Sequence, residues 1–121
     1  MTQSLEDYLE TVLILIQEKQ RARVSDIAKA MNVKMPSVIK ALFELKKLGL
    51  VLQEPYRDIE LTQKGKRLGN LILNRHTLLK SFLLKLGVQD DVAEKDACAM
   101  EHILSAQTLE KIKDFATKDM E

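Results

Sequence analysis

Hydrophobic positions recur with a helical period along most of this chain. Within residues 4–20, apolar residues stand three or four positions apart, which places them on one face of a helix. These residues are Leu5, Leu9, Val12, Leu13 and Ile16. Ser4, followed three residues later by Asp7, resembles a capping box at a helix start. The pattern predicts an amphipathic helix from Ser4 to about residues 18–20.

Two shorter helical stretches follow. Ser25 is predicted to cap a helix that ends just before Asn32, a residue suited to a left-handed C-cap. The next stretch has Pro36 in its first turn, where the missing N–H costs nothing, and Gly49 just beyond its end. A short turn therefore joins two helices.

The pattern then becomes strand-like in residues 51–54 and 58–61, with Pro55-Tyr56-Arg57 as the turn between them. Thr62 is predicted to cap a long helix that runs to about Leu86 and ends at Gly87.

A fifth helix is expected from Asp90 or Asp91 to Leu104, and a sixth after Ser105. The predicted fold is therefore mostly α with a small β-hairpin. Two helices, a turn and a hairpin in this order are typical of a winged helix-turn-helix. We predict a winged helix-turn-helix DNA-binding domain at residues 1–70 and a second, helical domain at residues 71–121.

Composition narrows the class of protein. A chain of 121 residues with 45% hydrophobic and 31% charged residues fits one or two small globular domains. A single cysteine cannot form an internal disulfide, which favours a reducing compartment. The N-terminus resembles no signal peptide, and no apolar run approaches the ~20 residues of a membrane span. We expect a cytoplasmic protein with no membrane partner.

The net charge of +1 conceals two segments of opposite sign. Residues 19–67 contain twelve Lys and Arg against five Asp and Glu, whereas the rest of the chain is acidic. A solvated face is the common explanation of a charged segment, but this asymmetry favours contact with nucleic acid. The expected partner is double-stranded DNA.

Candidate DNA contacts gather around the predicted turn and wing. Lys34, Pro36, Ser37 and Lys40 lie on the first turns of the third helix, which would enter the major groove. Arg57 in the wing, with Lys64 and Lys66 at the next helix start, suits phosphate contacts. Each lysine alone is more often a solvated surface residue, and only the shared location favours DNA.

The stretch CAMEH, residues 98–102, contains three types of metal ligand. Cys98, Glu101 and His102 are spaced so that all three share one helix face. Further ligands could come from Asp7 and Glu10, three apart on the first helix, and from His76 on the fourth. Ordinary explanations remain open, because carboxylates suit a helix N-terminus and a histidine or cysteine can simply be buried in a core.

Several motifs together carry a family resemblance. The pieces SLEDYLETV, ARVSDIA, PSV, EPYR, LTQKGKRLG, NRHTLL and CAMEHILS occur in this order between Ser4 and about Phe115. The chain resembles the diphtheria toxin repressor and manganese transport regulator family. The resemblance implies a metal-dependent transcriptional repressor that acts as a homodimer, with the second domain serving metal binding and dimerisation.

Carried across position by position, the resemblance implies six metal ligands: Asp7, Glu10, His76, Cys98, Glu101 and His102. The set is a hybrid, because Asp7 resembles the manganese-type regulators and Cys98 the iron-type ones. Lys80 stands where iron-type members carry an acidic ligand of an ancillary metal site, which argues against that site. The expected effector is Mn²⁺ or Fe²⁺, with Zn²⁺, Co²⁺ or Cd²⁺ able to substitute.

The resulting hypothesis is a repressor of Mn or Fe uptake genes that binds a palindromic operator once a divalent ion fixes the DNA-binding domains of a dimer. An alternative is a winged-helix regulator that responds to an organic ligand or to none. An enzyme is disfavoured, because six ligands leave little open coordination, and no small-molecule substrate is expected.

Three details complete the expectations. Dimer contacts are predicted at the apolar residues Leu79, Phe82, Leu83, Ile103 and Leu109. Ile39 on the third helix either touches thymine methyls or packs internally. Asp58 stands at the wing turn, where it tolerates left-handed geometry and would add negative charge near DNA.

Overall fold

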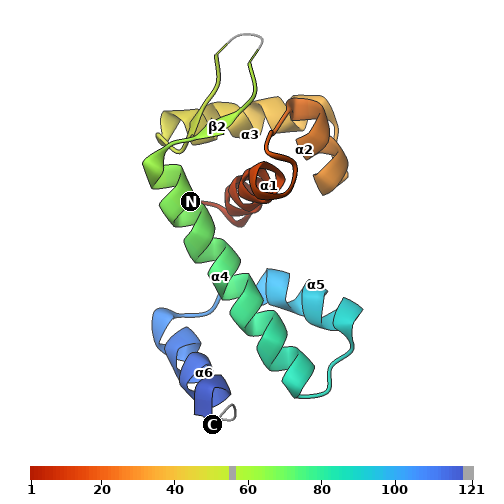
Figure 1. Ribbon diagram of the computed structural model, residues 1–121, viewed down its shortest axis with the longest axis vertical. Helices are drawn as coiled ribbons and strands as arrows, with labels where there is room; N and C mark the ends of the chain where they lie inside the picture. Colours follow the sequence, from red (N-terminus) through yellow and green to blue (C-terminus); the bar gives the residue numbers. More distant parts are fainter. Residues whose placement is uncertain (55–56, 119–121) are drawn as a thin grey trace. The chain divides into compact units, whose positions relative to one another are not determined.

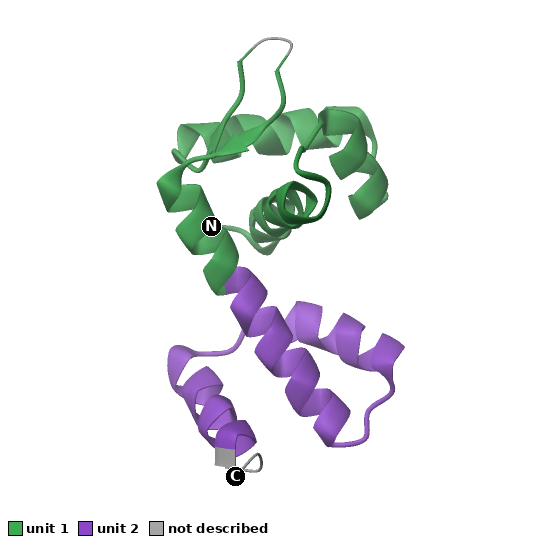
Figure 2. Cartoon of the chain, viewed as in Figure 1, with its two compact units in different colours: residues 1–71 green, residues 72–121 purple. Residues whose placement is uncertain are grey.

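The computed structural model describes residues 1–54 and 57–118. Within these residues, six helices and two short strands follow one another. Their arrangement is drawn in Figure 1. The chain divides into two compact units, residues 1–71 and residues 72–121, coloured separately in Figure 2. The domain functions assigned from the sequence to residues 1–70 and 71–121 stay predictions, because a compact unit does not by itself show what it binds.

Unit 1 is a helical core with a hairpin attached. It contains helices α1 (Gln3–Lys19), α2 (Val24–Met31) and α3 (Met35–Lys47) and strands β1 (Val51–Leu52) and β2 (Glu60–Leu61), followed by the start of α4 (Gln63–Lys85). The three helices pack on one another and bury aliphatic side chains with almost no exposure. Among these are Leu9, Val12, Ile27, Val38, Leu45 and Leu50. The helical spacing of these residues creates the common core.

Local signals set most helix ends. Asn32 adopts left-handed geometry with φ of 56° after α2, as predicted. Gly49, with φ of 73°, follows α3, and Leu50 N–H donates to the carbonyl of Leu45 at 3.0 Å. Pro36 lies in the first turn of α3, as predicted. Such ends satisfy terminal carbonyls that helical hydrogen bonding leaves over.

Two predicted N-caps are wrong. Helix α1 is capped by Thr2, whose hydroxyl accepts from Leu5 N–H at 3.2 Å, and so it begins before Ser4. Helix α2 begins at Val24 with Arg23 at the cap position, so Ser25 lies inside its first turn. Because Thr2 and Ser4 are both competent caps, local chemistry alone could not choose between them.

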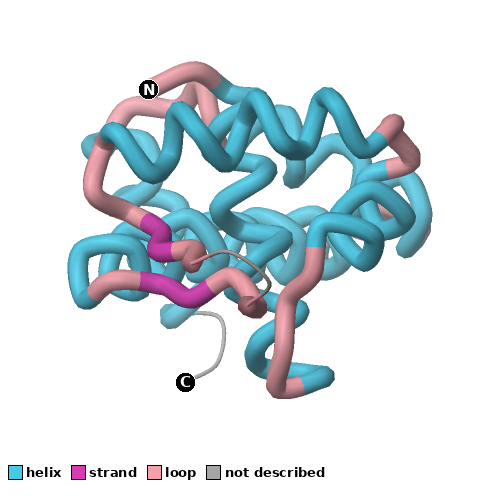
Figure 3. Tube along the Cα trace, turned by 90° about the horizontal axis from the view of Figure 1, so that it is seen from above, coloured by secondary structure: helices cyan, strands magenta, loops and turns pink. Residues whose placement is uncertain are grey.

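The hairpin is shorter than predicted. Strands β1 and β2 pair antiparallel with Val51 opposite Leu61, and each contains only two residues. They are the magenta segments in Figure 3. Residues 53–54 and 58–59 lie outside the ladder. The predicted turn at Pro55-Tyr56-Arg57 falls partly outside the described residues.

Asp58 connects the wing to the segment between α1 and α2. Its carboxylate accepts from Arg21 at 2.9 and 3.2 Å and lies 3.7 Å from Arg23. Beside it, Ile59 N–H donates to the carbonyl of Ala22 at 2.9 Å. Asp58 does not adopt the left-handed geometry that it would tolerate, because its φ is not positive, and two guanidinium groups offset its charge. This residue therefore anchors the base of the wing.

The start of α4 lies against the end of α3. Thr62 accepts from Gly65 N–H at 3.0 Å, which confirms the predicted cap, and its hydroxyl lies 2.7 Å from the carbonyl oxygen of Gly49. A Cβ on Gly65 would collide with the carbonyl of Leu50. Glycine is therefore required at residue 65 for the close approach of two backbone segments.

Unit 2 contains the rest of α4, α5 (Asp90–Met100) and α6 (Ala106–Lys118). Its core is formed by Leu79, Leu83, Ala93 and Ala97, with larger side chains packed around them. Gly87, with φ of 95°, follows α4 as predicted, and Ser105 accepts from Thr108 N–H at 3.2 Å at the start of α6. Helix α5 ends at Met100 and not at Leu104.

No helix in the described part of the chain is both long enough and apolar enough to cross a membrane.

Replacing Gly65 with alanine should destabilise unit 1 by about 1–3 kcal/mol, because backbone atoms must move to admit the new methyl group. Gly69→Ala is the matched control, since the atoms nearest to its Cβ would belong to the Leu13 side chain, the closest at 3.3 Å, and not to the backbone. Urea unfolding followed by circular dichroism measures both. Equal stability of the two variants would contradict the close approach at Gly65.

The ion pairs at Asp58 predict a pH dependence. The hydrogen bond from Arg21, supported by Arg23, holds the pKa of the Asp58 carboxyl below its ordinary value of 3.8. Because the folded-state pKa is lowered, this stabilisation is present above 3.8 and is lost as the pH falls through the folded-state pKa. Asp58→Asn should therefore lower Tm at neutral pH, and the difference in Tm from the wild type should shrink as the pH falls below 3.8. A variant at the exposed Glu60, Glu60→Gln, is the control.

Candidate metal centre

Glu101 occupies the C-cap of α5 and is 1% exposed. Helix α5 brings it to this position because the small residues Ala93 and Ala97 lie in the unit's core and allow a close approach to α4. A buried carboxylate is costly unless polar or charged groups surround it. The groups that surround Glu101 therefore indicate what this part of unit 2 can bind.

Two imidazole rings flank the Glu101 carboxylate. Nδ1 of His76 lies 3.1 Å from Oε2, and Nε2 of His102 lies 3.3 Å from Oε1. His76 comes from the middle of α4, and His102 from the turn after α5. Both rings are nearly covered, with side-chain exposures of 13% and 2%. Each oxygen of one buried carboxylate thus faces an imidazole nitrogen.

Cys98 joins this group from the last turn of α5. Cys98, Glu101 and His102 each offer one ligand atom, and these atoms lie within 4.8 Å of one another. The sequence predicted this grouping from a shared helix face. The reason was partly wrong, because α5 ends at Met100 and His102 lies in the turn beyond it.

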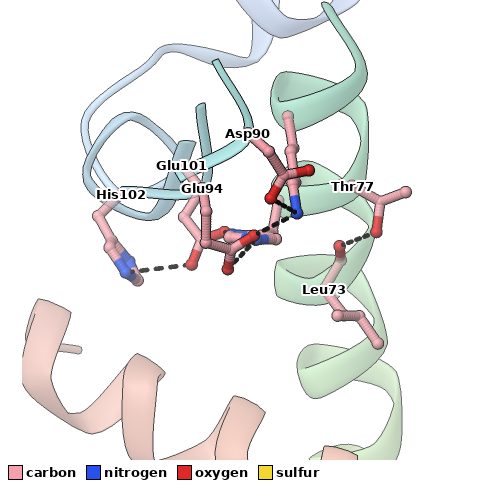
Figure 4. A network of polar contacts seen from close by, with 8 residues as sticks. Leu73, Thr77, Asp90, Glu94, Glu101 and His102 are labelled. Atoms are coloured by element: carbon pink, nitrogen blue, oxygen red, sulfur yellow. Dashed lines mark hydrogen bonds and ion pairs between the residues drawn. The ribbon is translucent and has the colours of Figure 1, made fainter. Parts of the chain in front are cut away.

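His76 makes a second contact with its other ring nitrogen. Its Nε2 lies 2.9 Å from Oε1 of Glu94 on α5. Oε2 of Glu94 lies 3.0 Å from Nζ of Lys80, which also lies 3.5 Å from Asp90. In Figure 4, Asp90, Glu94 and Glu101 lie on the α5 side of this network, and a dashed line joins Glu101 to His102.

Sequence reasoning did not predict that Glu94 contacts His76 or that Lys80 contacts Glu94. One signal was available: Lys80 stands four residues after His76 and Glu94 seven before Glu101, so each shares a helix face with its neighbour. What the sequence did not provide is the register between α4 and α5.

Charge in this network is balanced locally. Burial raises the pKa of the Glu94 carboxyl, but hydrogen bonds from Lys80 and His76 outweigh it and the pKa lies below the ordinary 4.5. The hydrogen bond to Glu94 raises the pKa of Lys80 above 10.5 despite some desolvation. Lys80 and Glu94 are therefore a cation and an anion at neutral pH.

The donor set fits a divalent metal ion. A neutral imidazole carries one N–H, yet His76 faces a carboxylate at each nitrogen, so one of the two contacts needs a second proton or a metal cation. An ion beside Nδ1 and the Glu101 carboxylate would satisfy both groups. The nearby thiol, carboxylate and second imidazole are ligands that Mn²⁺, Fe²⁺ and Zn²⁺ accept.

Asp7 and Glu10, the other two predicted ligands, lie on α1 in unit 1. Their spacing of three residues puts them on neighbouring positions of one helix face. Asp7 is partly buried and Glu10 is buried. The structure therefore groups His76, Cys98, Glu101 and His102 within unit 2, and Asp7 and Glu10 on one helix of unit 1.

The predicted DNA contacts lie on the surface of unit 1. Lys34, Pro36, Ser37 and Lys40 are exposed at the start of α3. Ile39 is 56% exposed, so it does not pack internally. Arg57 pairs with Glu54 at 3.3 Å, and Nζ of Lys64 donates to the carbonyl of Leu48 at 3.2 Å.

The predicted dimer contacts separate into two groups. Leu79 and Leu83 lie in the core of unit 2, with exposures of 0% and 9%, so the prediction that they contact a second subunit is wrong. Phe82 and Leu109 are partly buried against that core, whereas Ile103 is 74% exposed. Phe82 also lines a groove along α4 and α6 with Leu86, Ile112 and Phe115.

Comparison with known proteins gives matches over almost the whole chain. Residues 1–59 match the family model described as the iron-dependent repressor N-terminal DNA-binding domain. Residues 62–118 match the model described as the iron-dependent repressor metal-binding and dimerisation domain.

Curated relatives and solved structures agree with these matches. The chain is 43% identical over 114 residues to the HTH-type transcriptional regulator MntR of Geobacillus thermodenitrificans, covering 94% of this chain and 81% of that protein. The manganese regulator SloR matches with a TM-score of 0.85 and 29% identity over 97% of this chain and 55% of SloR. A manganese-dependent transcriptional repressor in complex with manganese matches with a TM-score of 0.81 and 26% identity, covering 91% of this chain and 51% of that one. The chain thus spans about half the length of these two solved proteins.

A thiolate bound to Co²⁺ or Cd²⁺ gives charge-transfer absorption, which tests Cys98 as a ligand. Titrating Co²⁺ into the reduced protein should produce a near-ultraviolet band that Cys98→Ser removes. Because Cys98 is the only cysteine, every such band must come from it. Cys98→Ser should still bind Mn²⁺, for which oxygen ligands suffice. The same band in Cys98→Ser would exclude thiolate ligation.

Proposed function

Because the chain belongs to the iron-dependent repressor family, we propose that it is a transcriptional repressor whose binding to operator DNA is switched on by a divalent metal ion. The observation that carries this proposal is the buried Glu101 carboxylate between the imidazoles of His76 and His102, next to the Cys98 thiol.

The family membership confirms the resemblance predicted from the sequence. It also confirms that the chain is a DNA-binding regulator and not an enzyme. The fold class is confirmed by the mostly helical structure with one small hairpin and by the likeness to SloR.

The proposed ligand set is Asp7, Glu10, His76, Cys98, Glu101 and His102. The contacts within unit 2 support the last four, and the resemblance supports Asp7 and Glu10. A bound divalent ion would offset two of the three negative charges of these carboxylates. Because Asp7 and Glu10 belong to the helix on which α2 and α3 pack, sharing an ion with unit 2 would restrict the DNA-binding unit.

The proposed effector is Mn²⁺ or Fe²⁺. Asp7, Glu10 and Glu101 supply hard oxygen donors, which suit both ions, while Cys98 shifts the preference toward softer ones. Zn²⁺, Co²⁺ and Cd²⁺ should therefore bind as well. The regulated genes would then be those for Mn or Fe uptake.

The proposed DNA contacts are Lys34, Pro36, Ser37 and Lys40 in the major groove, with Arg57 and Lys64 on phosphates. The first four are supported by their exposure at the start of α3, and Arg57 and Lys64 by the surplus of basic residues in this part of the chain. We propose that Ile39, also exposed there, touches thymine methyl groups, and its exposure supports this.

The dimerisation domain implies a homodimer, and we propose that the operator is palindromic with half-sites about one helical turn (~34 Å) apart. A candidate surface for the second copy is the apolar groove lined by Phe82, Leu86, Ile112 and Phe115. The exposed Ile103, which precedes α6 in the sequence, is a further candidate contact. Exposed aromatic and aliphatic side chains of this kind are typical of dimer interfaces.

The metal switch predicts that added Mn²⁺ or Fe²⁺ strengthens DNA binding about 5- to 150-fold over the chelated protein, the usual range of such coupling. The probe is a duplex enriched from a random library by the metal-loaded protein, and fluorescence anisotropy measures Kd. Asp7→Ala and His102→Ala should abolish the effect of metal.

Asp96→Ala is the matched control, since it removes an exposed carboxylate of α5 outside the proposed set. Equal Kd values with chelator and with metal would contradict the switch. That result would favour a regulator that senses an organic ligand or none.

A further inference from the structure

The His76 ring is held from two sides by α5. Its Nδ1 faces Glu101 at 3.1 Å, and its Nε2 faces Glu94 at 2.9 Å. Glu94 and Glu101 stand seven residues apart, two helical turns, so they follow one another along the face of α5 that meets α4. The imidazole lies between these two carboxylates, and only Glu101 belongs to the proposed ligand set.

Glu94 would be poorly fixed without a further partner. Its side chain is 52% exposed, and an exposed glutamate samples several rotamers. Here its two oxygens are divided between two donors: Oε1 lies against His76 and Oε2 lies 3.0 Å from Nζ of Lys80. Lys80 is itself only 29% exposed and has Asp90 as a second partner at 3.5 Å.

These contacts form two matched helical pairs. His76 and Lys80 are one turn apart on α4, and Asp90 and Glu94 are one turn apart on α5. The four side chains line one depression of unit 2. The pairing thus fixes the register of α4 against α5 at the level of the His76 ring.

The direction of the His76 hydrogen bond matters for a metal ligand. A histidine that donates one ring N–H to a carboxylate keeps the lone pair on its other nitrogen, and such outer partners orient ligands and raise their basicity. When Nε2–H donates to Glu94, the lone pair of Nδ1 is directed to the side of Glu101.

We propose that Glu94 and Lys80 are positioning residues, which together hold the His76 ring so that Nδ1 is presented to a metal ion beside Glu101. Glu94 accepts a hydrogen bond from Nε2–H, and Lys80 keeps Glu94 in the rotamer that does so. This inference rests on the proposed role of His76 as a ligand. It adds two residues outside the six proposed ligands.

The test is Zn²⁺ and Mn²⁺ affinity of the full chain, measured by competition with a chelating dye. Glu94→Ala should weaken Kd about 10- to 100-fold, the usual effect of losing an outer partner of a ligand. Lys80→Met should weaken it several-fold, since Glu94 remains but is less ordered. Glu94→Gln should recover most of the affinity of Glu94→Ala, because its amide oxygen still accepts from Nε2–H. Lys95→Met and Asp96→Ala, exposed positions on α5, are the matched controls.

A second measurement separates positioning from general destabilisation. In the Zn²⁺-loaded protein, proton–nitrogen NMR should show the Nε2–H of His76 in slow exchange, and Glu94→Ala should remove that signal. Wild-type Kd values in Glu94→Ala would overturn the inference. Two other results would also overturn it. One is a weakened Kd that is matched by a fall in the Tm of the metal-free protein. The other is a Lys80→Met protein that binds an additional ion and keeps the wild-type metal affinity.

Failure of the proposed function gives a different result. His76→Ala and Glu101→Ala should abolish tight metal binding if the proposed site is correct. Wild-type Kd values in these two variants would reject the site itself. Loss of binding in both, with Glu94→Ala unaffected, would reject only the role of Glu94 and Lys80.

Discussion

The buried carboxylate of Glu101 is the constraint on which unit 2 depends. A carboxylate that is 1% exposed must be surrounded by groups that offset its desolvation, and here two imidazoles contact its two oxygens. Those contacts require α5 to lie close to α4, and the alanines at residues 93 and 97 permit this. The same packing of α5 against α4 therefore forms both the apolar core and the polar centre. A larger side chain at either alanine would move the carboxylate away from His76.

Local sequence signals predicted much of the fold, because they act over a few residues. Asn32, Thr62 and Gly87 each end or begin a helix where their own chemistry predicts. The failures have equally local causes. Thr2 and Ser4 compete for one cap, and only two residues of each strand-like run pair in the ladder. Propensity alone does not resolve either case.

The candidate centre was predictable in part. The spacing of Cys98, Glu101 and His102 indicated a common location, although His102 reaches it from a turn and not from the helix. The roles of Glu94 and Lys80 depend on how α4 and α5 align, which no single segment encodes. The same limit explains the error at Leu79 and Leu83. Periodicity shows that a residue lies on the apolar face of its helix. It does not show whether that face is covered by a helix of the same chain or by a second copy.

The anchoring of the wing changes what the charge of unit 1 means. Twelve basic residues lie between residues 19 and 67, yet Arg21 and Arg23 face Asp58, and Arg57 faces Glu54. A guanidinium already matched by a carboxylate displaces fewer counterions from a DNA backbone than a solvated one does. The operator affinity should consequently fall less steeply with salt than the count of basic residues implies. Anchoring the base of the wing at Asp58 thus costs part of the electrostatic attraction of unit 1 to DNA.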